Sequence, residues 1–324
     1  MDFYGYMRPN GKAGARNYVL LLPVNRSLNF IASNVERMTR NTRHFEIPAE
    51  TGRTEVDREV IARTLIGLMN NANVGGIVLL AVKSGAGSAY KNMCAERFEE
   101  EARKTGKPFR IVYLTNVGGS YNMLGETLRL TREVLLEVSD FRRENCPLSA
   151  LTLGVKCGTS DATSGIAGNP CVGAAFDQLI RAGGTAFFSE TTEIIGAEDL
   201  VAKRAVNESV AKKILSAAKH WEDKAKATGE DIRKINPIPA NIAAGISSLE
   251  EKSLGAIAKS GTSPIQDVLK YAEMPKGSGL YFVDSWMSSL SLPLCLTACG
   301  ATIMLYQMGG GKIAQHPMMP SINP

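Results

Sequence analysis

A loop of fifteen residues, 156–170, constrains the fold of this chain more than any other segment. Its sequence, Lys-Cys-Gly-Thr-Ser-Asp-Ala-Thr-Ser-Gly-Ile-Ala-Gly-Asn-Pro, is rich in small and ionisable side chains. The apolar run 151–155 predicts a buried strand before the loop, and 171–182 has helical spacing after it. A second apolar run, 185–189, follows the helix. Ligands of open α/β sheets bind after the carboxyl ends of strands, so this long loop predicts a functional site.

The ends of the helix after this loop are also marked in the sequence. We expect Asn169 to cap the helix and Pro170 to occupy its first turn. Gly183 and Gly184 are expected to end it.

The N-terminal half alternates apolar runs with helical patterns. The predicted strands and helices, in chain order, are 18–24, 27–40, 55–70, 76–82, 88–104, 109–114 and 121–138. This alternation is typical of a doubly wound parallel sheet. The polar run 140–147 is the expected linker. It divides the chain into an N-terminal α/β domain, 1–147, and a C-terminal α/β domain, 148–324.

The C-terminal half repeats the pattern with longer loops. Strands are predicted at 151–155, 185–189, 279–283 and 301–306, with helices around 197–228 and 249–260. Each strand is followed by chemically capable residues: Lys156 and Cys157, Glu190 and Glu193, Asp284 and Ser285, and the segment 307–312. We therefore predict an α/β fold with two doubly wound, mainly parallel sheets. The carboxyl ends of the C-terminal strands should meet at one edge.

Composition and charge exclude several classes of protein. The net charge of +5 is spread among alternating acids and bases, which argues against nucleic-acid binding. No apolar run approaches the roughly 20 residues that span a bilayer, and the N-terminus lacks a signal-peptide pattern, so we expect a cytoplasmic protein without membrane contact. The six cysteines form no Cys-x-x-Cys pair, and Cys171, Cys295 and Cys299 are expected to be core thiols.

The residues of the long loop allow two interpretations. Lys156 is either a lysine that reaches water from a strand end or a base or charge clamp, because burial lowers a lysine pKa readily. Cys157 is either an inert neighbour or a thiolate ligand. The hydroxyl and carboxylate side chains that follow either bind a polyhydroxylated ligand or cap their own turns. They are Ser160, Asp161, Thr163 and Ser164.

Other candidates also have a structural alternative. Glu190 and Glu193 either line the rim of a cleft or belong to the start of a helix. Ser248 and Glu251 have the spacing of a capping box, which favours a structural role for Glu251. Asn241, in a turn before that helix, is a better site candidate. His220 and His316 are expected to have no role in a functional site.

The loop motif Lys-Cys-Gly-x-Ser-Asp-x-x-Ser-Gly-x-x-x-Asn-Pro resembles the altronate and galactarate dehydratase family of sugar-acid lyases, which includes the large subunit of sulfolactate sulfo-lyase. Further matching segments run in order over nearly the whole chain: Gly5-Tyr6 with Arg8, Gly14 and Arg16-Asn17; 183–185 with 190–198; 250–255; 279–284; and Asn323-Pro324.

The resemblance implies a lyase that removes water or sulfite from a hydroxy acid and yields a 2-keto acid, with Fe²⁺ or Mn²⁺ as cofactor. Proton removal beside a carboxylate needs a base and stabilisation of the enediolate. On the matched positions, Lys156 or Glu190 is the expected base, Asp161 with Glu193 lies around the metal or leaving group, and Asp284 completes the catalytic set. Substrate-binding residues would be Arg16, Asn17, Ser160, Thr163, Ser164, Asn169, Asn241 and Lys252. Lys252 and Lys259 are candidate anion clamps, and Cys157, Glu190 and His44 are candidate metal ligands.

The chain also departs from the family pattern. Where relatives carry cysteine-containing segments, it has Asn25-Arg26-Ser27, 44–50 and 83–87, and 308–312 replaces a Thr-Gly-Arg/Gln-Gly segment. Roughly 60 further residues are expected after Asn323-Pro324, judged by ordinary domain size. The small N-terminal domain of some relatives is also lacking, which favours a separate small subunit in a homo-oligomeric assembly. Sulfolactate-type lyase activity, or a non-catalytic sugar-acid binder, stands as the alternative.

Overall fold

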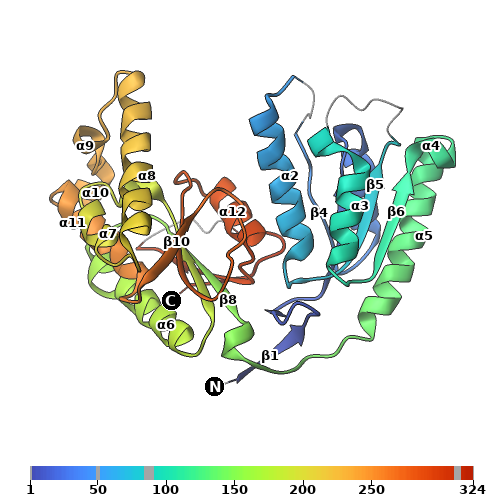
Figure 1. Ribbon diagram of the computed structural model, residues 1–324, viewed down its shortest axis with the longest axis horizontal. Coiled ribbons are helices and arrows are strands. Elements are labelled where there is room, and N and C mark those ends of the chain that lie inside the picture. Colours follow the sequence, from blue (N-terminus) through green and yellow to red (C-terminus); the bar gives the residue numbers. More distant parts are fainter. Residues whose placement is uncertain (1, 49–51, 84–90, 310–314, 324) are drawn as a thin grey trace. The chain divides into compact units, whose positions relative to one another are not determined.

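The computed structural model describes residues 2–48, 52–83, 91–309 and 315–323. The chain divides into two compact units, Asp2–Cys146 and Pro147–Pro324. Each unit contains a parallel sheet covered by helices (Figure 1). The predicted α/β fold, with mainly parallel sheets, is therefore confirmed.

The sheet of the N-terminal unit has four parallel strands in the order β4-β3-β5-β6. They are β3 (Tyr18–Pro23), β4 (Thr42–His44), β5 (Val74–Ala81) and β6 (Phe109–Tyr113). Every residue of β5 is buried. A parallel strand buried along its whole length has both faces covered.

Four helices cover these two faces. They are α1 (Asn29–Met38), α2 (Glu55–Asn70), α3 (Ala95–Lys104) and α5 (Ser120–Ser139). Helices α1 and α5 pack on the face that contains Val78 and Leu80. Helices α2 and α3 contact each other and β5. Because strand side chains alternate, Ile77 and Leu79 face the opposite side.

Shorter elements complete the unit. The helical turns are η1 (Arg26–Leu28), η2 (Lys91–Met93) and α4 (Leu114–Val117). A small sheet in the order β2-β1-β7 contains β1 (Asp2–Met7), β2 (Ala13–Gly14) and β7 (Glu144–Pro147).

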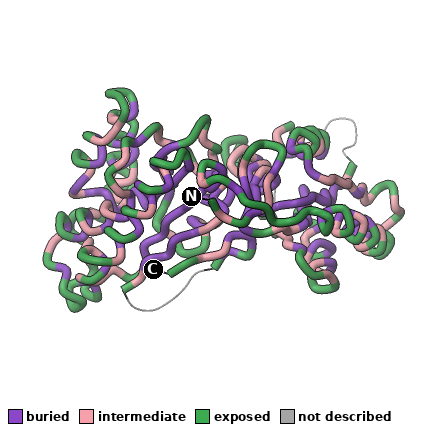
Figure 2. The backbone as a smooth tube through the Cα atoms, turned by 90° about the horizontal axis from the view of Figure 1, so that it is seen from below, coloured by how far each residue is buried: buried purple, intermediate pink, exposed green. Residues whose placement is uncertain are grey.

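The sheet of the C-terminal unit has six parallel strands in the order β10-β11-β9-β8-β12-β13. They are β8 (Thr152–Cys157), β9 (Thr185–Phe188), β10 (Ile265–Leu269), β11 (Gly279–Val283), β12 (Ile303–Gln307) and β13 (Ser321–Ile322). The carboxyl ends of β8, β9 and β11 therefore share one edge, as the sequence predicts. Every residue of β8, β9 and β11 is buried, and Figure 2 shows that buried and exposed segments alternate along the backbone.

Helices lie on both faces of this sheet. Helix α12 (Ser291–Cys299) packs against Phe187, Tyr281 and Met304. Helix α6 (Asn169–Arg181) contacts β8, β9 and β11. The remaining helical segments are η3 (Leu148–Ala150), η4 (Ser164–Gly168), η5 (Thr191–Glu193), α7 (Glu198–Ala202), α8 (Glu208–Ala227), α9 (Ile232–Ile235), α10 (Pro239–Ala243), α11 (Leu249–Ile257) and η6 (Ala258–Ser260).

Three local predictions were wrong. Asn169 does not cap α6, because the π-helical turn η4 runs directly into the helix and Asn169 is its first residue. Cys171 is exposed, whereas Cys295 and Cys299 are buried as expected; all six cysteines are free thiols. Helix α3 begins at Ala95, and residues 88–90 of the predicted helix lie outside the described residues. Strand β10 and helix α12 were not predicted.

No helix among the described residues is long and apolar enough to cross a membrane.

Close backbone contact between α6 and η6 depends on Gly173. A Cβ atom at this position would lie 2.2 Å from the carbonyl oxygen of Ala258 and 2.8 Å from the nitrogen of Gly261. Both neighbours are backbone atoms, which cannot move aside as a flexible side chain does.

We predict that Gly173→Ala lowers the free energy of unfolding by about 1–3 kcal/mol, the usual cost of overpacking a core. Thermal or urea denaturation measures this change. Gly125→Ala is the matched control, because nothing lies within 4 Å of that Cβ position in α5. Equal stability of the two variants would contradict the predicted contact.

Candidate active site

Four buried ionisable side chains meet at the carboxyl edge of the C-terminal sheet. Lys156 is the penultimate residue of β8, Glu190 follows β9, Glu193 lies in η5 and Lys259 lies in η6. Each is at most 3% exposed. Lys156 Nζ is paired with Glu190 Oε1, and Lys259 Nζ lies 2.5 Å from Glu190 Oε2 and 2.6 Å from Glu193 Oε2. We call these four residues the charge cluster.

The backbone at Glu190 is held in an unusual conformation. Its φ of 73° and ψ of 62° place this non-glycine residue in the left-handed region. The carboxylate also accepts a hydrogen bond of 3.1 Å from the backbone N–H of Cys157. Conformations of this kind cost free energy and concentrate at functional sites.

The charges within the cluster shift the pKa values of its members. Burial raises the pKa of Glu190, but Lys259 and Lys156 outweigh this effect and hold it below its usual value. Burial and the charge of Glu190 raise the pKa of Glu193. The pKa values of Lys156 and Lys259 are raised by the carboxylates, despite burial. Lys156 is thus an ammonium group, which favours its interpretation as a charge clamp.

A cavity of about 310 Å³ lies between the long loop and α11. One hydrogen bond joins its two walls, from Asn169 Nδ2 to the carbonyl oxygen of Gly255 (2.9 Å). Two more join the loop to α10: Asn241 Nδ2 donates to the carbonyl oxygen of Ser160 (3.1 Å), and Ala162 N donates to that of Ala244 (3.3 Å). We call this cavity the loop cavity. The predicted site residues that line it are Ser160, Asp161, Ser164, Asn169 and Lys252.

Two glycines set the distance between the walls of this cavity. A Cβ atom on Gly165 would lie 3.3 Å from the Cα of Gly255, and one on Gly255 would lie 3.1 Å from the Cα of Gly165. Both residues line the cavity. The π-helical turn η4 therefore touches α11 backbone to backbone.

Asn169 lines this cavity and carries a buried acceptor without a partner among the described residues. Its side chain is 1% exposed, and its Oδ1 atom has no hydrogen-bond partner among the described residues. Its Nδ2 atom lies 3.8 Å from the thiol of Cys157. A buried acceptor without a partner is costly, so this oxygen is suited to a ligand hydroxyl.

Asp161 organises the loop itself. Its Oδ1 atom accepts hydrogen bonds from Thr163 Oγ1 (2.7 Å), from Ser164 N (2.9 Å) and from Ser164 Oγ (3.1 Å). These bonds lower the pKa of Asp161, so it stays a carboxylate. Asp161 and Thr163 therefore cap their own turn, which is the structural one of the two roles that the sequence allows. Thr163 is exposed, whereas Ser164 is buried.

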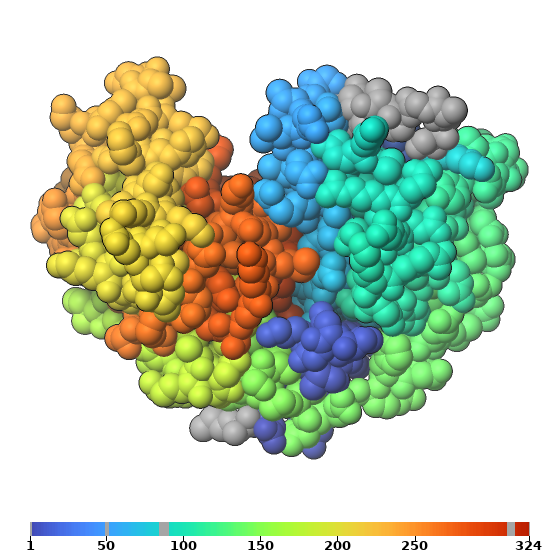
Figure 3. Space-filling view, viewed as in Figure 1, coloured from blue at the N-terminus to red at the C-terminus, as the bar shows by residue number. Residues whose placement is uncertain are grey.

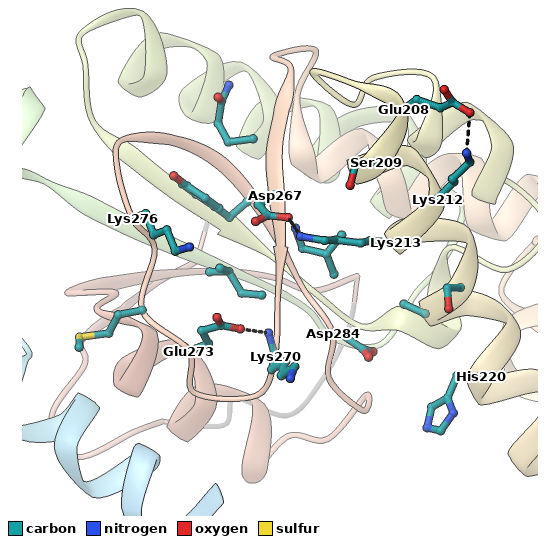
Figure 4. Close-up of a pocket in the computed structure, with 17 residues that line it drawn as sticks. Glu208, Ser209, Lys212, Lys213, His220, Asp267, Lys270, Glu273, Lys276 and Asp284 are labelled. Atoms are coloured by element: carbon teal, nitrogen blue, oxygen red, sulfur yellow. Dashed lines mark hydrogen bonds and ion pairs between the residues drawn. The ribbon is translucent and has the colours of Figure 1, made fainter. Parts of the chain in front are cut away.

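Asp284 lines a different hollow from the loop cavity. Its Oδ1 atom accepts hydrogen bonds from Thr191 Oγ1 (2.7 Å) and from Trp221 Nε1 (2.9 Å). It borders a groove of about 1160 Å³ between α8 and β10, where Lys213 pairs with Asp267 (Figure 4). Helix α8 and the segment after β10 flank this groove on the face seen in Figure 3. Among the described residues, Asp284 shares no hydrogen bond with Lys156 or Glu190.

Arg16, Asn17 and His44 belong to the N-terminal unit. Arg16 is exposed and donates to its neighbour's carbonyl, Ala15 O, at 3.1 Å. Asn17 is built into the fold, since it accepts from Arg8 Nη2 (2.9 Å) and donates to the carbonyl oxygen of Val138 (2.9 Å). His44 Nδ1 is paired with Glu36.

The described residues do not fit the divalent ion that the family resemblance implies. Among them, no group of three or more His, Cys, Asp or Glu side chains is placed to hold a metal. The carboxylates of Glu190 and Glu193 are already paired with ammonium groups. Burial raises the pKa of the Cys157 thiol to about 11, so without a metal ion the thiol is protonated at neutral pH. Dependence on Fe²⁺ or Mn²⁺ stays a prediction.

Comparison with known proteins shows the family to which the chain belongs. Residues 148–323 match the model of the D-galactarate/altronate dehydratase C-terminal domain, and residues 5–139 match that of the D-galactarate dehydratase/altronate hydrolase second domain. The chain belongs to the galactarate and altronate dehydratase family. The resemblance inferred from the sequence motifs is thereby confirmed.

Three relatives show the range of this similarity. The (2R)-sulfolactate sulfo-lyase subunit beta of Chromohalobacter salexigens is 33% identical over 99% of this chain and 80% of its own length. The altronate dehydratase of Bacillus subtilis is 32% identical, and the galactarate dehydratase (L-threo-forming) of Escherichia coli is 31% identical. Each of these two matches covers 95% of this chain, which spans 62% of the length of the dehydratase.

The sequence did not indicate that Lys259 belongs to the charge cluster. It named this lysine only as a candidate anion clamp, because Lys259 comes from a turn after α11 and not from a strand end. In the sequence, Lys259 is marked only by its position two residues before Gly261, the glycine expected to end the helix. The structure confirms this end, since Gly261 has a φ of 67°.

We predict that Glu190→Gln lowers the free energy of unfolding by about 3–5 kcal/mol, since it leaves two buried ammonium groups with one carboxylate. Because the folded pKa of Glu190 lies below its ordinary 4.5, the difference from wild type should be full above pH 4.5 and shrink as the pH falls below it. Urea denaturation at several pH values measures this. Asp223→Asn, which breaks an exposed pair with Lys219, should leave stability unchanged.

Proposed function

We propose that this protein is a carbon–oxygen lyase that dehydrates a sugar acid of the altronate or galactarate type to a 2-keto-3-deoxy acid. The observation that carries the proposal is the loop cavity, which combines the unpartnered Asn169 Oδ1 with the buried amine of Lys252. A hydroxylated acid offers hydroxyl groups to both.

The residues around the cavity suit such a ligand. Ser160 and Ser164 contribute hydroxyl groups, and the adjacent charge cluster contributes the ammonium groups of Lys156 and Lys259. Fixed positive charge stabilises the enediolate that forms when a proton leaves the carbon beside a carboxylate. The relatives named as altronate and galactarate dehydratases support the same reaction class.

Sulfolactate-type lyase activity is the second candidate. It is favoured by the match to the sulfo-lyase subunit beta, which extends over 80% of that relative. The name of that relative, a subunit beta, also supports the proposal that this chain works with a second subunit. In both reactions a group leaves the carbon next to the one that loses a proton, so one cavity could serve either.

The decisive experiment is a 2-keto-acid release assay. Purified protein is incubated anaerobically with hexarates, hexonates and sulfolactate, with and without added Fe²⁺ or Mn²⁺, and sulfite is measured in parallel. Keto-acid release from a sugar acid without sulfite supports the dehydratase, and release of sulfite supports the sulfo-lyase. Binding of sugar acids by calorimetry without any release would contradict both and indicate a non-catalytic binder.

We predict that Asn169→Ala raises the KM for the sugar acid about 2–10-fold with a smaller change in kcat, because one neutral hydrogen bond contributes about 0.5–1.5 kcal/mol. Steady-state kinetics in the same assay measures both constants. Cys171→Ser, an exposed position on the same helix, is the control and should behave as wild type. An unchanged KM in Asn169→Ala would contradict the contact.

A further inference from the structure

Lys252 differs from the other two lysines of the site in its partners. Lys156 and Lys259 are both paired with carboxylates. The amine of Lys252 instead lies 2.5 Å from Asn236 Oδ1 and 2.9 Å from Asn241 Oδ1, and it has no carboxylate partner among the described residues. Its side chain lines the loop cavity and is 9% exposed.

The amide groups around Lys252 are oriented as acceptors. Asn241 Nδ2 donates to the carbonyl oxygen of Ser160, which turns Asn241 Oδ1 towards the amine. A neutral amine has two N–H bonds and one lone pair. Two carbonyl oxygens therefore satisfy both of its hydrogens and leave the lone pair available to a proton in the cavity.

The charged surroundings also distinguish Lys252. Burial lowers its pKa below the ordinary 10.5 and outweighs the opposing influence of Glu193, Cys157 and Glu190, while Lys259 lowers it further. The other titratable residues that line the cavity are Asp161 and Glu251, and hydrogen bonds hold the pKa of each below its usual value. Of the titratable groups described there, Lys252 is thus the one suited to exchange a proton above acidic pH.

We propose that Lys252 is the base that removes the proton from the carbon next to the carboxylate of the bound acid. The inference rests on the proposed function. The electron pair of that C–H bond forms the double bond to the neighbouring carbon, whose C–O bond breaks so that the hydroxyl leaves with its electrons. The ammonium formed at Lys252 returns its proton to the departing hydroxide as water. The remaining enol then becomes the 2-keto acid by moving its hydroxyl proton to carbon.

Two substitutions separate this role from that of an anion clamp. Lys252→Arg keeps the positive charge but cannot give up its proton near neutral pH, and Lys252→Ala removes the amine. Both should lower kcat about 10²–10⁴-fold, the range of general acid–base catalysis. Small primary amines added to Lys252→Ala should restore part of kcat, in the order of their basicity. Lys219→Met, at an exposed position of α8, is the control.

A second measurement does not depend on turnover. Competitive acetylation over a pH series, read by mass spectrometry, gives the pKa of individual lysines. Lys252 should titrate below Lys219, whose exposed pair with Asp223 raises its pKa. In wild type, kcat/KM should rise with pH up to the pKa so measured, because the neutral amine is the active form.

The outcomes separate the two claims. A wild type that releases keto acid together with an equally active Lys252→Arg overturns the role of Lys252 alone. Titration of Lys252 at or above Lys219 overturns that role as well. A wild type that releases no keto acid from any of the acids overturns the proposed function, and the base with it.

Discussion

The carboxylate of Glu190, enclosed between two ammonium groups, is the interaction on which the reactive edge of the C-terminal unit depends. It joins the end of β8 to the end of β9 through Lys156 and to η6 through Lys259. A buried carboxylate without partners would be neutralised or expelled, so the two lysines are a condition for its burial. Because Lys259 follows α11, the same interaction fixes the helix that forms one wall of the loop cavity.

The parts of this arrangement that come from strands could be predicted from the sequence. Short apolar runs ending in ionisable residues marked β8, β9 and β11, and their parallel order follows from the helices between them. The meeting of Lys156 with Glu190 follows from the pairing of β8 with β9. Strand β10 was missed because Gln266 and Asp267 interrupt its apolar pattern, and α12 because it is apolar all round.

The parts that depend on side-chain direction could not be predicted. Asp284 follows β11 as expected, but Thr191 and Trp221 hold its carboxylate beside the groove of α8. Asn25 lies in a segment where the family resemblance implies a cysteine, and its Oδ1 atom accepts a hydrogen bond of 3.0 Å from the backbone N–H of Val82. The sequence shows which strand each of these residues follows. It does not show which side chains or backbone groups they will bind. The departures at 84–87 and 310–312 lie outside the described residues.

The contact between Gly165 and Gly255 has a consequence for substrate choice. Since each residue has only hydrogen where the other backbone approaches, the smallest enlargement of either one would wedge the turn away from the helix. The width of the loop cavity is then set at two positions that carry no ionisable side chain. A substitution at either glycine would therefore change the width of the loop cavity while every charged group keeps its place.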